Sequence, residues 1–191
     1  MFASVNALFN HPGLRKVLVK ARGALVPVAG VAVLWFMTRD CRWLWAGLAV
    51  SLFGEAIQLW CFAALNKNAE LVCQGPYAVV RNPMYLGRFF IVLGMVMLLG
   101  VWWVLPVFAV LYYLYMLNRV KREEAKLEKI FGVPFTEYCA AVGRFLPGPV
   151  YRDNPLWVWS WTLFRQNHGD RNCLATVAFW VVAMAWACLR P

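Results

Sequence analysis

The chain has 191 residues, which suits a single domain, and 62% of them are hydrophobic and 16% aromatic. Soluble domains are only about half apolar, so this composition argues against an ordinary soluble fold and predicts a multi-pass membrane protein. The formal net charge of +10 fits lysines and arginines kept on the cytoplasmic side of a membrane. It does not indicate nucleic-acid binding, because no basic cluster with interleaved aromatics stands apart from the apolar segments.

The six cysteines form no CxxC pair and have no histidine at metal-ligand spacing. We therefore predict free thiols, with neither a disulfide nor a metal site. The N-terminus lacks a basic start followed by an apolar run and a small-residue cleavage site, so we expect no cleaved signal peptide.

Residues 1–22 place basic side chains between apolar ones at helical spacing. This pattern predicts an interfacial basic arm, with a disordered tail as the alternative. Residues 23–191 are expected to form a single membrane domain, whose first transmembrane helix runs from Ala24 to Met37. That run is short for a bilayer crossing, but the flanking Arg22 and Arg39 can extend their charged ends to the interface.

The second transmembrane helix is expected from Trp43 to Leu65, with Glu55 and Gln58 near its middle. An ionisable side chain at that depth costs at least a few kcal/mol and usually faces a cavity or a partner. Glu55 is therefore a candidate functional residue. An interhelical hydrogen bond is the alternative explanation, and the residues alone do not choose between the two.

The stretch GPYAVVRNPMYLG, residues 75–87, joins a polar turn to the next apolar run. The Gly-Pro step predicts a turn, Asn82 is a favourable N-cap residue, and Pro83 suits the first helical position. A helix that begins at Pro83 would direct its positive dipole end toward Arg81, which favours an anion there. A plain interfacial turn with a helix cap is the alternative interpretation.

The segment that follows, from Met84 to Leu117, is a nearly unbroken apolar sequence of 34 residues. One membrane crossing needs only about 20 residues. The run must therefore fold as a helical hairpin, and we expect its uncharged tip at Gly100, on the opposite side of the membrane.

The second helix of this hairpin continues into the charged segment NRVKREEAKLEKIF, residues 118–131. Gly132 is expected to end it. Because the hairpin returns to the interface from which it started, Glu123 and Glu124 should lie on the same side of the membrane as Asn82.

The rest of the chain begins with a polar and aromatic connection, residues 133–172. We expect a short helix from Pro155, capped by Asp153 or Asn154, in the lipid headgroup region, because tryptophans alternate along it. Residues 173–189 are a last apolar run, just long enough to be the final transmembrane helix.

The basic residues test this arrangement. Sixteen of the 19 lysines and arginines fall on the side that holds the N-terminus and residues 75–87, which places that side in the cytoplasm. We therefore expect an all-α polytopic membrane protein with about five transmembrane helices, a helical hairpin and a cytosolic cofactor pocket. It would lie in the bacterial inner membrane, with its N-terminus and its active site in the cytoplasm.

Several chemical groups gather on this cytoplasmic face: a helix N-terminus with an arginine, tyrosine rings and two adjacent carboxylates. They suit a zwitterionic, cationic cofactor, because amides and arginine bind a carboxylate, a glutamate binds an ammonium, and an aromatic face tolerates a sulfonium. S-adenosylmethionine carries all three groups. The competing interpretation is ordinary helix-surface pairing of Arg119 with Glu123 and of Glu123 with Lys126, and the residues alone favour it.

The order of GPYAVVRNPMYLG, an apolar hairpin, REEAKLEKIFG, EYCAAV and GRFLP resembles the isoprenylcysteine carboxyl methyltransferase and phospholipid methyltransferase superfamily of integral membrane enzymes. The resemblance covers residues 65–147, which we expect to be the methyltransferase-like core. It implies that S-adenosylmethionine binds beneath the cytosolic surface. It also implies that a lipophilic acceptor, with a carboxylate, thiol or amine head group, enters from the bilayer.

The resemblance implies roles for individual residues as well. The first motif and the glutamate pair would hold the cofactor, through Tyr77, Arg81, Asn82, Tyr85, Leu86, Gly87, Glu123 and Glu124. Arg144 would orient the acceptor or close the pocket. Glu55 is the second catalytic candidate, and we predict that it contacts the head group of the acceptor.

Two positions depart from the superfamily pattern. Asn82 stands where many members have histidine, so it keeps a cap and a hydrogen bond but lacks a titratable ring. Phe135 stands where tyrosine is common. Two other functions stay open: a NAD(P)H-dependent membrane reductase of the sterol-reductase type, which has a similar C-terminal motif, and a non-enzymatic membrane partner or transport protein.

Overall fold

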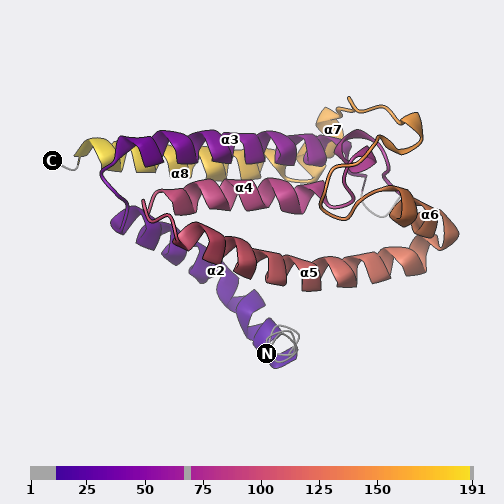
Figure 1. Cartoon of the computed structure of the whole chain (residues 1–191), viewed down its shortest axis with the longest axis horizontal. Helices are drawn as coiled ribbons and strands as arrows, with labels where there is room; N and C mark the ends of the chain where they lie inside the picture. The colour runs from indigo at the N-terminus through magenta and orange to yellow at the C-terminus, as the bar shows by residue number, and fades with distance from the viewer. Residues whose placement is uncertain (1–11, 67–69, 190–191) are drawn as a thin grey trace.

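The computed structural model describes residues 12–66 and 70–189, and every regular element in these residues is helical. Figure 1 shows a bundle in which α3, α4 and α8 lie side by side, with the long helix α5 beneath them and α2 at an angle to the bundle. The elements are α2 (Pro12–Trp35), α3 (Cys41–Ala64), η1 (Gly75–Ala78), α4 (Pro83–Met97), α5 (Val104–Phe131), α6 (Val133–Ala141), η2 (Tyr151–Asp153), α7 (Trp161–Gln166) and α8 (Gly169–Leu189).

Helices α3 and α4 form the closest contact in the bundle, and small residues make it possible. A Cβ atom built on Gly54 would lie 2.5 Å from the carbonyl oxygen of Gly87, and one built on Gly47 would lie 2.5 Å from that of Gly94. Between these glycine pairs, the hydroxyl of Ser51 donates to the carbonyl of Ile91 at 2.8 Å. Small residues that bring two helix backbones together are typical of helix pairs in membranes. The contact determines where α4 begins relative to the end of α3.

The expected hairpin is confirmed. Helix α4 ends at Met97, and Gly100 lies in the turn with a φ of 68°, which is a conformation that favours glycine. Helix α5 then runs without a break for 28 residues, about 42 Å at 1.5 Å per residue. Its charged second half therefore extends beyond the apolar part of the hairpin, and Gly132, with a φ of 57°, ends it as expected.

The segment after α5 differs from the prediction in two ways. An additional helix, α6, follows Gly132 directly, and the proline at 134 occupies its first turn. The expected helix from Pro155 is wrong: residues 155–160 are not helical, and α7 starts only at Trp161. The side chain of Ser160 caps α7 by accepting from the amide of Leu163 at 3.4 Å, so the predicted caps at Asp153 and Asn154 do not start this helix.

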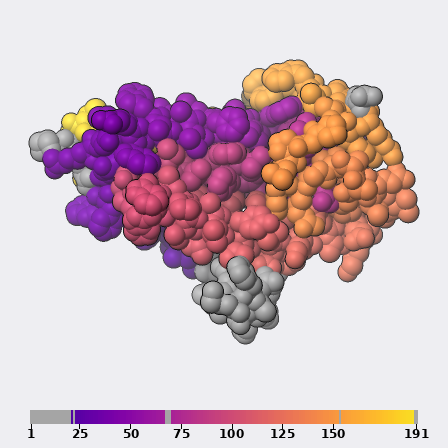
Figure 2. Space-filling model, in the orientation of Figure 1, coloured from indigo at the N-terminus to yellow at the C-terminus, as the bar shows by residue number. Residues whose placement is uncertain are grey.

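The physical reason for this error lies in backbone pairing to distant segments. The amide of Gly75 donates to the carbonyl of Pro155 at 2.9 Å, and the amide of Ser160 donates to the carbonyl of Ala63 at 3.1 Å. Residues 155–160 are thus held in a non-helical path across the end of α3. Figure 2 shows the orange part of the chain, between α6 and α8, covering much of the end of the molecule where α4 begins.

Helix α2 is continuous from Pro12 to Trp35, with Pro27 inside it, so residues 12–22 and the expected first span belong to one helix. Residues 1–11 lie outside the described part of the chain. The position of residues 1–22 on a membrane surface stays a prediction.

Two helices, α3 and α8, are long and apolar enough to cross a membrane, judged by length and composition. The apolar part of α2, residues 23–35, and α4 are shorter apolar helices. Large hydrophobic side chains are exposed on α2, α5 and α8, for example Val26, Val110 and Val181. Soluble monomers rarely expose so much apolar surface. The total of five crossings and the orientation stay predictions.

Candidate functional site

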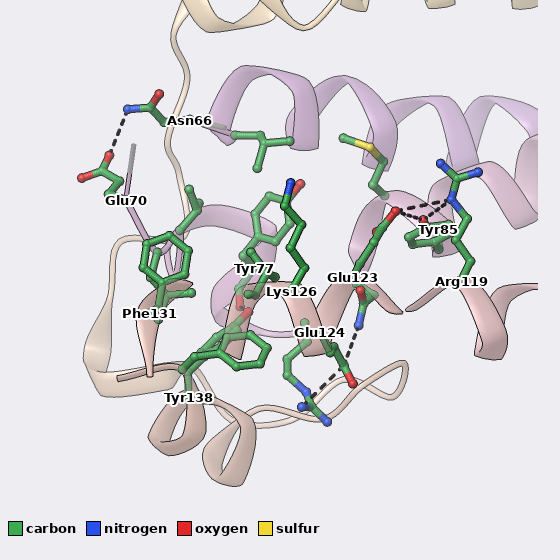
Figure 3. Close-up of a pocket in the computed structure, with 18 of the residues that line it drawn as sticks. Asn66, Glu70, Tyr77, Tyr85, Arg119, Glu123, Glu124, Lys126, Phe131 and Tyr138 are labelled. Atoms are coloured by element: carbon green, nitrogen blue, oxygen red, sulfur yellow. Dashed lines mark hydrogen bonds and ion pairs between the residues drawn. The ribbon is translucent and has the colours of Figure 1, made fainter. Parts of the chain in front are cut away.

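A cavity of about 480 Å³ lies at the end of the bundle where α4 begins. Its walls come from the connection after α3, from η1, from the first turns of α4, from the charged half of α5 and from α6 (Figure 3). Six of the eight predicted cofactor residues line it: Tyr77, Arg81, Asn82, Tyr85, Glu123 and Glu124. The hairpin therefore brings the two separate sequence motifs to one cavity, as expected.

The wall formed by η1 is buried and is held by later parts of the chain. The phenol of Tyr138 on α6 donates to the carbonyl oxygen of Tyr77 at 2.7 Å, and the amide of Arg81 donates to the carbonyl of Gly143 at 2.9 Å. Burial raises the pKa of both Tyr77 and Tyr138 well above the ordinary value of a phenol. Both side chains therefore stay neutral over the physiological pH range.

Glu124 is the centre of an ion-pair cluster at one side of the cavity. Its carboxylate lies 2.6 Å from Nη2 of Arg144 and 3.5 Å from Nη1 of Arg81, and its side chain is only 12% exposed. Asn82 donates to the same carboxylate at 3.3 Å and to the carbonyl of Arg144 at 3.4 Å. Glu124 therefore ties together the start of α4, the second half of α5 and the segment after α6.

Asn82 occupies the N-cap position of α4, as predicted, but its side chain forms no capping hydrogen bond. Its amide nitrogen instead contacts Glu124, as described above. The first-turn amides of α4 are thus not covered by the side chain that precedes them. This leaves the helix N-terminus beside Arg81, where the dipole favours a negative group.

Glu123 faces a different environment from its neighbour. Its carboxylate accepts from the phenol of Tyr85 at 2.7 Å and lies 3.4 Å from Nε of Arg119. Arg119 also donates to Tyr85 at 2.7 Å and to Tyr115 at 3.2 Å. The Glu123 side chain is 48% exposed. Figure 3 shows that Glu123 points toward Tyr85 and Arg119, whereas Glu124 points away from them.

The competing interpretation of the charged helix is therefore partly correct. The pair of Arg119 with Glu123 forms at the spacing of four residues. This pair nevertheless lies at the cavity, because both of its members line it. Arg119 and Glu123 therefore form an ordinary helix-surface ion pair and also contribute to the wall of the cavity.

Glu55 lies elsewhere, in a polar contact between α3 and α8. Its carboxylate accepts from the amide of Asn172 at 3.1 and 3.3 Å and from the hydroxyl of Thr176 at 2.8 Å. Gln58 joins the group by donating to the carbonyl oxygen of the Asn172 side chain at 3.3 Å. Glu55 is buried and is not among the residues that line the described cavity. This arrangement favours the interhelical explanation, and the contact of Glu55 with an acceptor stays a prediction.

Three other predicted site residues are also not among the residues that line the described cavity. Gly87 meets Gly54 in the contact of α3 with α4, Leu86 is its neighbour, and Arg144 reaches the site through Glu124. The roles of these residues toward a cofactor or an acceptor stay predictions.

Several cavity residues were not predicted as site residues. Arg88 lies one helical turn beyond Met84 on α4, Arg119 lies one turn before Glu123 on α5, and Tyr138 comes from the unexpected helix α6. The first two carry a signal that the sequence contains, since residues spaced by four share a helix face with the motif residues. Tyr138 lies in the EYCAAV segment that contributed to the resemblance, but its spacing from the other site residues gives no such signal.

The comparisons with known proteins agree with this geometry. Residues 43–133, which contain all of η1, α4 and α5 and nearly all of α3, match the phospholipid methyltransferase family. The resemblance to the superfamily that the motifs indicated is thus confirmed. Most of the cavity wall lies within this segment, whereas Phe135 and Tyr138 of α6 lie outside it.

Two curated relatives match parts of the chain. One is the protein-S-isoprenylcysteine O-methyltransferase of Schizosaccharomyces pombe, 37% identical over 82 residues, which are 43% of this chain and 35% of that protein. The other is the cobalt-zinc-cadmium resistance protein CzcN of Cupriavidus metallidurans, 28% identical over 127 residues, which are 65% of this chain and 57% of that protein. The matches thus span about a third and somewhat over half of the relatives' lengths. No solved structure matches the chain significantly.

Proposed function

We propose that the protein is an integral membrane methyltransferase, which uses S-adenosylmethionine to methylate a lipophilic or membrane-embedded acceptor. The observation that carries this proposal is the cavity in which Glu123, the Tyr85 ring and Arg81 meet at the start of α4. These residues lie inside the segment that matches the phospholipid methyltransferase family. The S. pombe relative, named as an O-methyltransferase, supports the same chemistry.

The cavity fits the cofactor in size and in chemical groups. Its volume of about 480 Å³ lies within the usual range for small-molecule sites. Glu123 is the half-exposed carboxylate for the amino group, and the ring of Tyr85 or Tyr77 suits the sulfonium. The carboxylate would bind at the start of α4 beside Arg81, whose Nε is buried and makes no hydrogen bond within the described residues.

S-adenosylmethionine, when bound, supplies an electrophilic methyl group. The protein's own residues position the reactants and exclude water, which is how binding energy accelerates a displacement of this kind. The buried wall of Tyr77 and Tyr138 keeps water out, while Glu124 orients Arg81 and Asn82. A carboxylate or thiolate acceptor needs no base, whereas an amine or a hydroxyl would need a proton acceptor.

The proposal includes a topology. We propose five membrane crossings in the bacterial inner membrane, with the N-terminus and the cavity in the cytoplasm. The basic residues on that side and the charged second half of α5 support this orientation.

The alternative functions have less support. A reductase of the sterol-reductase type would need a nicotinamide dinucleotide site, and the matched family and the S. pombe relative favour methyl transfer instead. The name of the CzcN relative associates that protein with cobalt, zinc and cadmium resistance. The described residues of this chain contain no group of three or more His, Cys, Asp or Glu side chains that could hold a metal ion.

The test is transfer of a radiolabelled methyl group from S-adenosylmethionine into solvent-extractable material in membranes that contain the protein. Wild-type membranes should label at least one lipophilic product, and Glu123→Ala should strongly reduce the labelling at a cofactor concentration that does not saturate the variant. Glu128→Ala is the matched control, because Glu128 is an exposed glutamate of the same helix outside the cavity wall. Equal labelling in membranes with and without the protein would contradict the proposal.

A further inference from the structure

Arg88 is an arginine in the cavity wall for which the proposed cofactor site has no use. It is the sixth residue of α4, about 7.5 Å along the helix from its start at 1.5 Å per residue. The residues that follow it are apolar for the rest of α4. Arg88 therefore lies on the side of the cavity that faces the membrane part of the bundle. An ionisable residue at such a position is costly and usually serves a function.

Arg88 differs from the other two arginines that line the cavity. Arg81 pairs with Glu124, and Arg119 pairs with Glu123. Within the described residues, Arg88 makes no ion pair with a carboxylate. Its guanidinium carbon lies 6.0 Å from the centroid of the Tyr85 ring. A cation over an aromatic ring is attracted to it, but its charge is not neutralised. The cavity thus contains a partly buried positive charge that lacks an anion.

Tyr85 separates this charge from the proposed cofactor groups. The guanidinium carbon of Arg119 lies 5.9 Å from the same ring centroid, and the phenol oxygen of Tyr85 contacts Glu123 at 2.7 Å. Glu123 and Arg119 therefore form an ion pair at the phenol end of Tyr85. Arg88 lies beside the ring and can bind another anion. Tyr112 and the aromatic rings of Phe89 and Phe108 continue from there toward the membrane part of the bundle.

We propose that Arg88 is the residue that binds the anionic group, a carboxylate or a phosphate, of an amphiphilic methyl acceptor. A guanidinium presents a planar set of donors that matches both of these groups. The apolar and aromatic surface of α4 and α5 beside it suits a hydrocarbon chain. This inference rests on the proposed function, because it takes the bound amphiphile to be the acceptor.

The test measures binding without any reaction. Protein in nanodiscs of zwitterionic phosphatidylcholine is titrated with three amphiphiles that have the same 14-carbon chain: tetradecanoate, tetradecyl phosphate and tetradecanol. Empty nanodiscs correct for partitioning into lipid. Wild type should bind at least one of the two anions about tenfold more tightly than the alcohol, as expected for hydrogen bonds to a charged group, and the two anionic arms distinguish carboxylate from phosphate.

The variants assign this preference to one side chain. Arg88→Gln should remove the preference for the anion, and Arg88→Lys should keep part of it. Both variants should bind S-adenosylmethionine within about twofold of the wild-type affinity, because Arg88 contacts none of the proposed cofactor groups except the ring of Tyr85. Arg122→Gln is the control, since Arg122 is an exposed arginine of α5 outside the cavity wall. If Arg88→Gln does not fold, Arg88→Met, which suits an apolar helix, replaces it.

Three results would overturn the inference: no preference for either anion in wild type, an unchanged preference in Arg88→Gln, or a loss of S-adenosylmethionine binding in Arg88→Gln with the amphiphile preference intact. The last result would make Arg88 a cofactor residue. Failure of wild type to bind S-adenosylmethionine would refute the proposed function instead. The anion preference would still report on Arg88 in that case, so the two failures are distinguishable.

Discussion

Glu123 and Glu124 are adjacent in the chain but have different surroundings, and their variants should therefore have different effects. Glu124 lies between Arg81 and Arg144 and is mostly buried. Glu124→Gln should lower the free energy of unfolding by roughly 2–3 kcal/mol, because it leaves two arginines close together without their carboxylate. Thermal unfolding of the detergent-purified protein, followed by tryptophan fluorescence, measures this loss.

Glu123→Gln is the matched comparison. Its ion pair with Arg119 is nearly half exposed on both sides, and such pairs contribute only about 0–1 kcal/mol. We expect almost wild-type unfolding for this variant. Equal losses of stability in the two variants would show that the two glutamates do not differ in the way described here.

Glu55 gives a prediction that separates a catalytic role from a structural one. If it contacts the acceptor head group, Glu55→Gln should lower turnover and leave the affinity for S-adenosylmethionine unchanged. If its role is the contact with Asn172 and Thr176, the variant should change mainly the unfolding temperature. Steady-state turnover and calorimetry on the same preparation decide, and unchanged turnover would exclude the catalytic role.

For single residues, the sequence predicts where a side chain lies in the fold more reliably than it predicts which side chains it contacts. Asn82 at the N-cap and Glu123 and Glu124 at the same interface follow from local signals and from the hairpin. The different surroundings of the two glutamates could not be predicted, because they depend on contacts of Glu124 with Arg81 and Arg144, which are far from it in the chain. The direction of the Asn82 side chain follows from the same ion-pair cluster.

Helices α3 and α4 meet through glycines, and this contact positions the start of α4 at the cavity. Gly54→Ala would place a methyl group 2.5 Å from the carbonyl oxygen of Gly87. Overpacking of this kind costs about 1–3 kcal/mol. We therefore expect a lower unfolding temperature and weaker binding of S-adenosylmethionine, because α4 must move away from α3.

The control for this variant is Gly23→Ala in α2. A Cβ atom at Gly23 has no neighbouring atom within 4 Å, and alanine favours a helix over glycine by about 1 kcal/mol. Gly23→Ala should therefore keep or slightly raise the unfolding temperature and leave the cofactor affinity of wild type unchanged. If both variants behave alike, the glycine contact does not determine the position of α4.

The hairpin and the extension of α5 could be predicted from the length of the apolar run and the charge pattern after it. The course of the segment after α5 could not be predicted in this way. A nearly unbroken apolar run of 34 residues must fold back on itself, and a segment with charges at helical spacing continues it. The stretch from Pro155 to Ser160 has alternating tryptophans, and its course depends on hydrogen bonds to Gly75 and Ala63. Short segments of this kind have no periodicity that separates a helix from an extended strap.

The whole molecule has two ends, and the proposed topology assigns them to opposite sides of the membrane. Cys41 is exposed at the start of α3, at the end of the bundle that also holds the hairpin tip, while Lys121 is exposed on α5 near the cavity. In intact cells, a membrane-impermeant maleimide should label a variant that retains only Cys41. It should not label a cysteine-free variant with Lys121→Cys until the membrane is opened. The reverse pattern would invert the topology.

The central claim is that the cavity binds S-adenosylmethionine, and calorimetry on folded, detergent-purified protein tests it most directly. Wild type and the Glu128→Ala control should bind the cofactor saturably at one site. Glu123→Ala should bind at least about tenfold more weakly, as expected for the loss of one charged hydrogen bond, at an unchanged unfolding temperature. Wild-type protein that is folded and shows no binding would contradict the account.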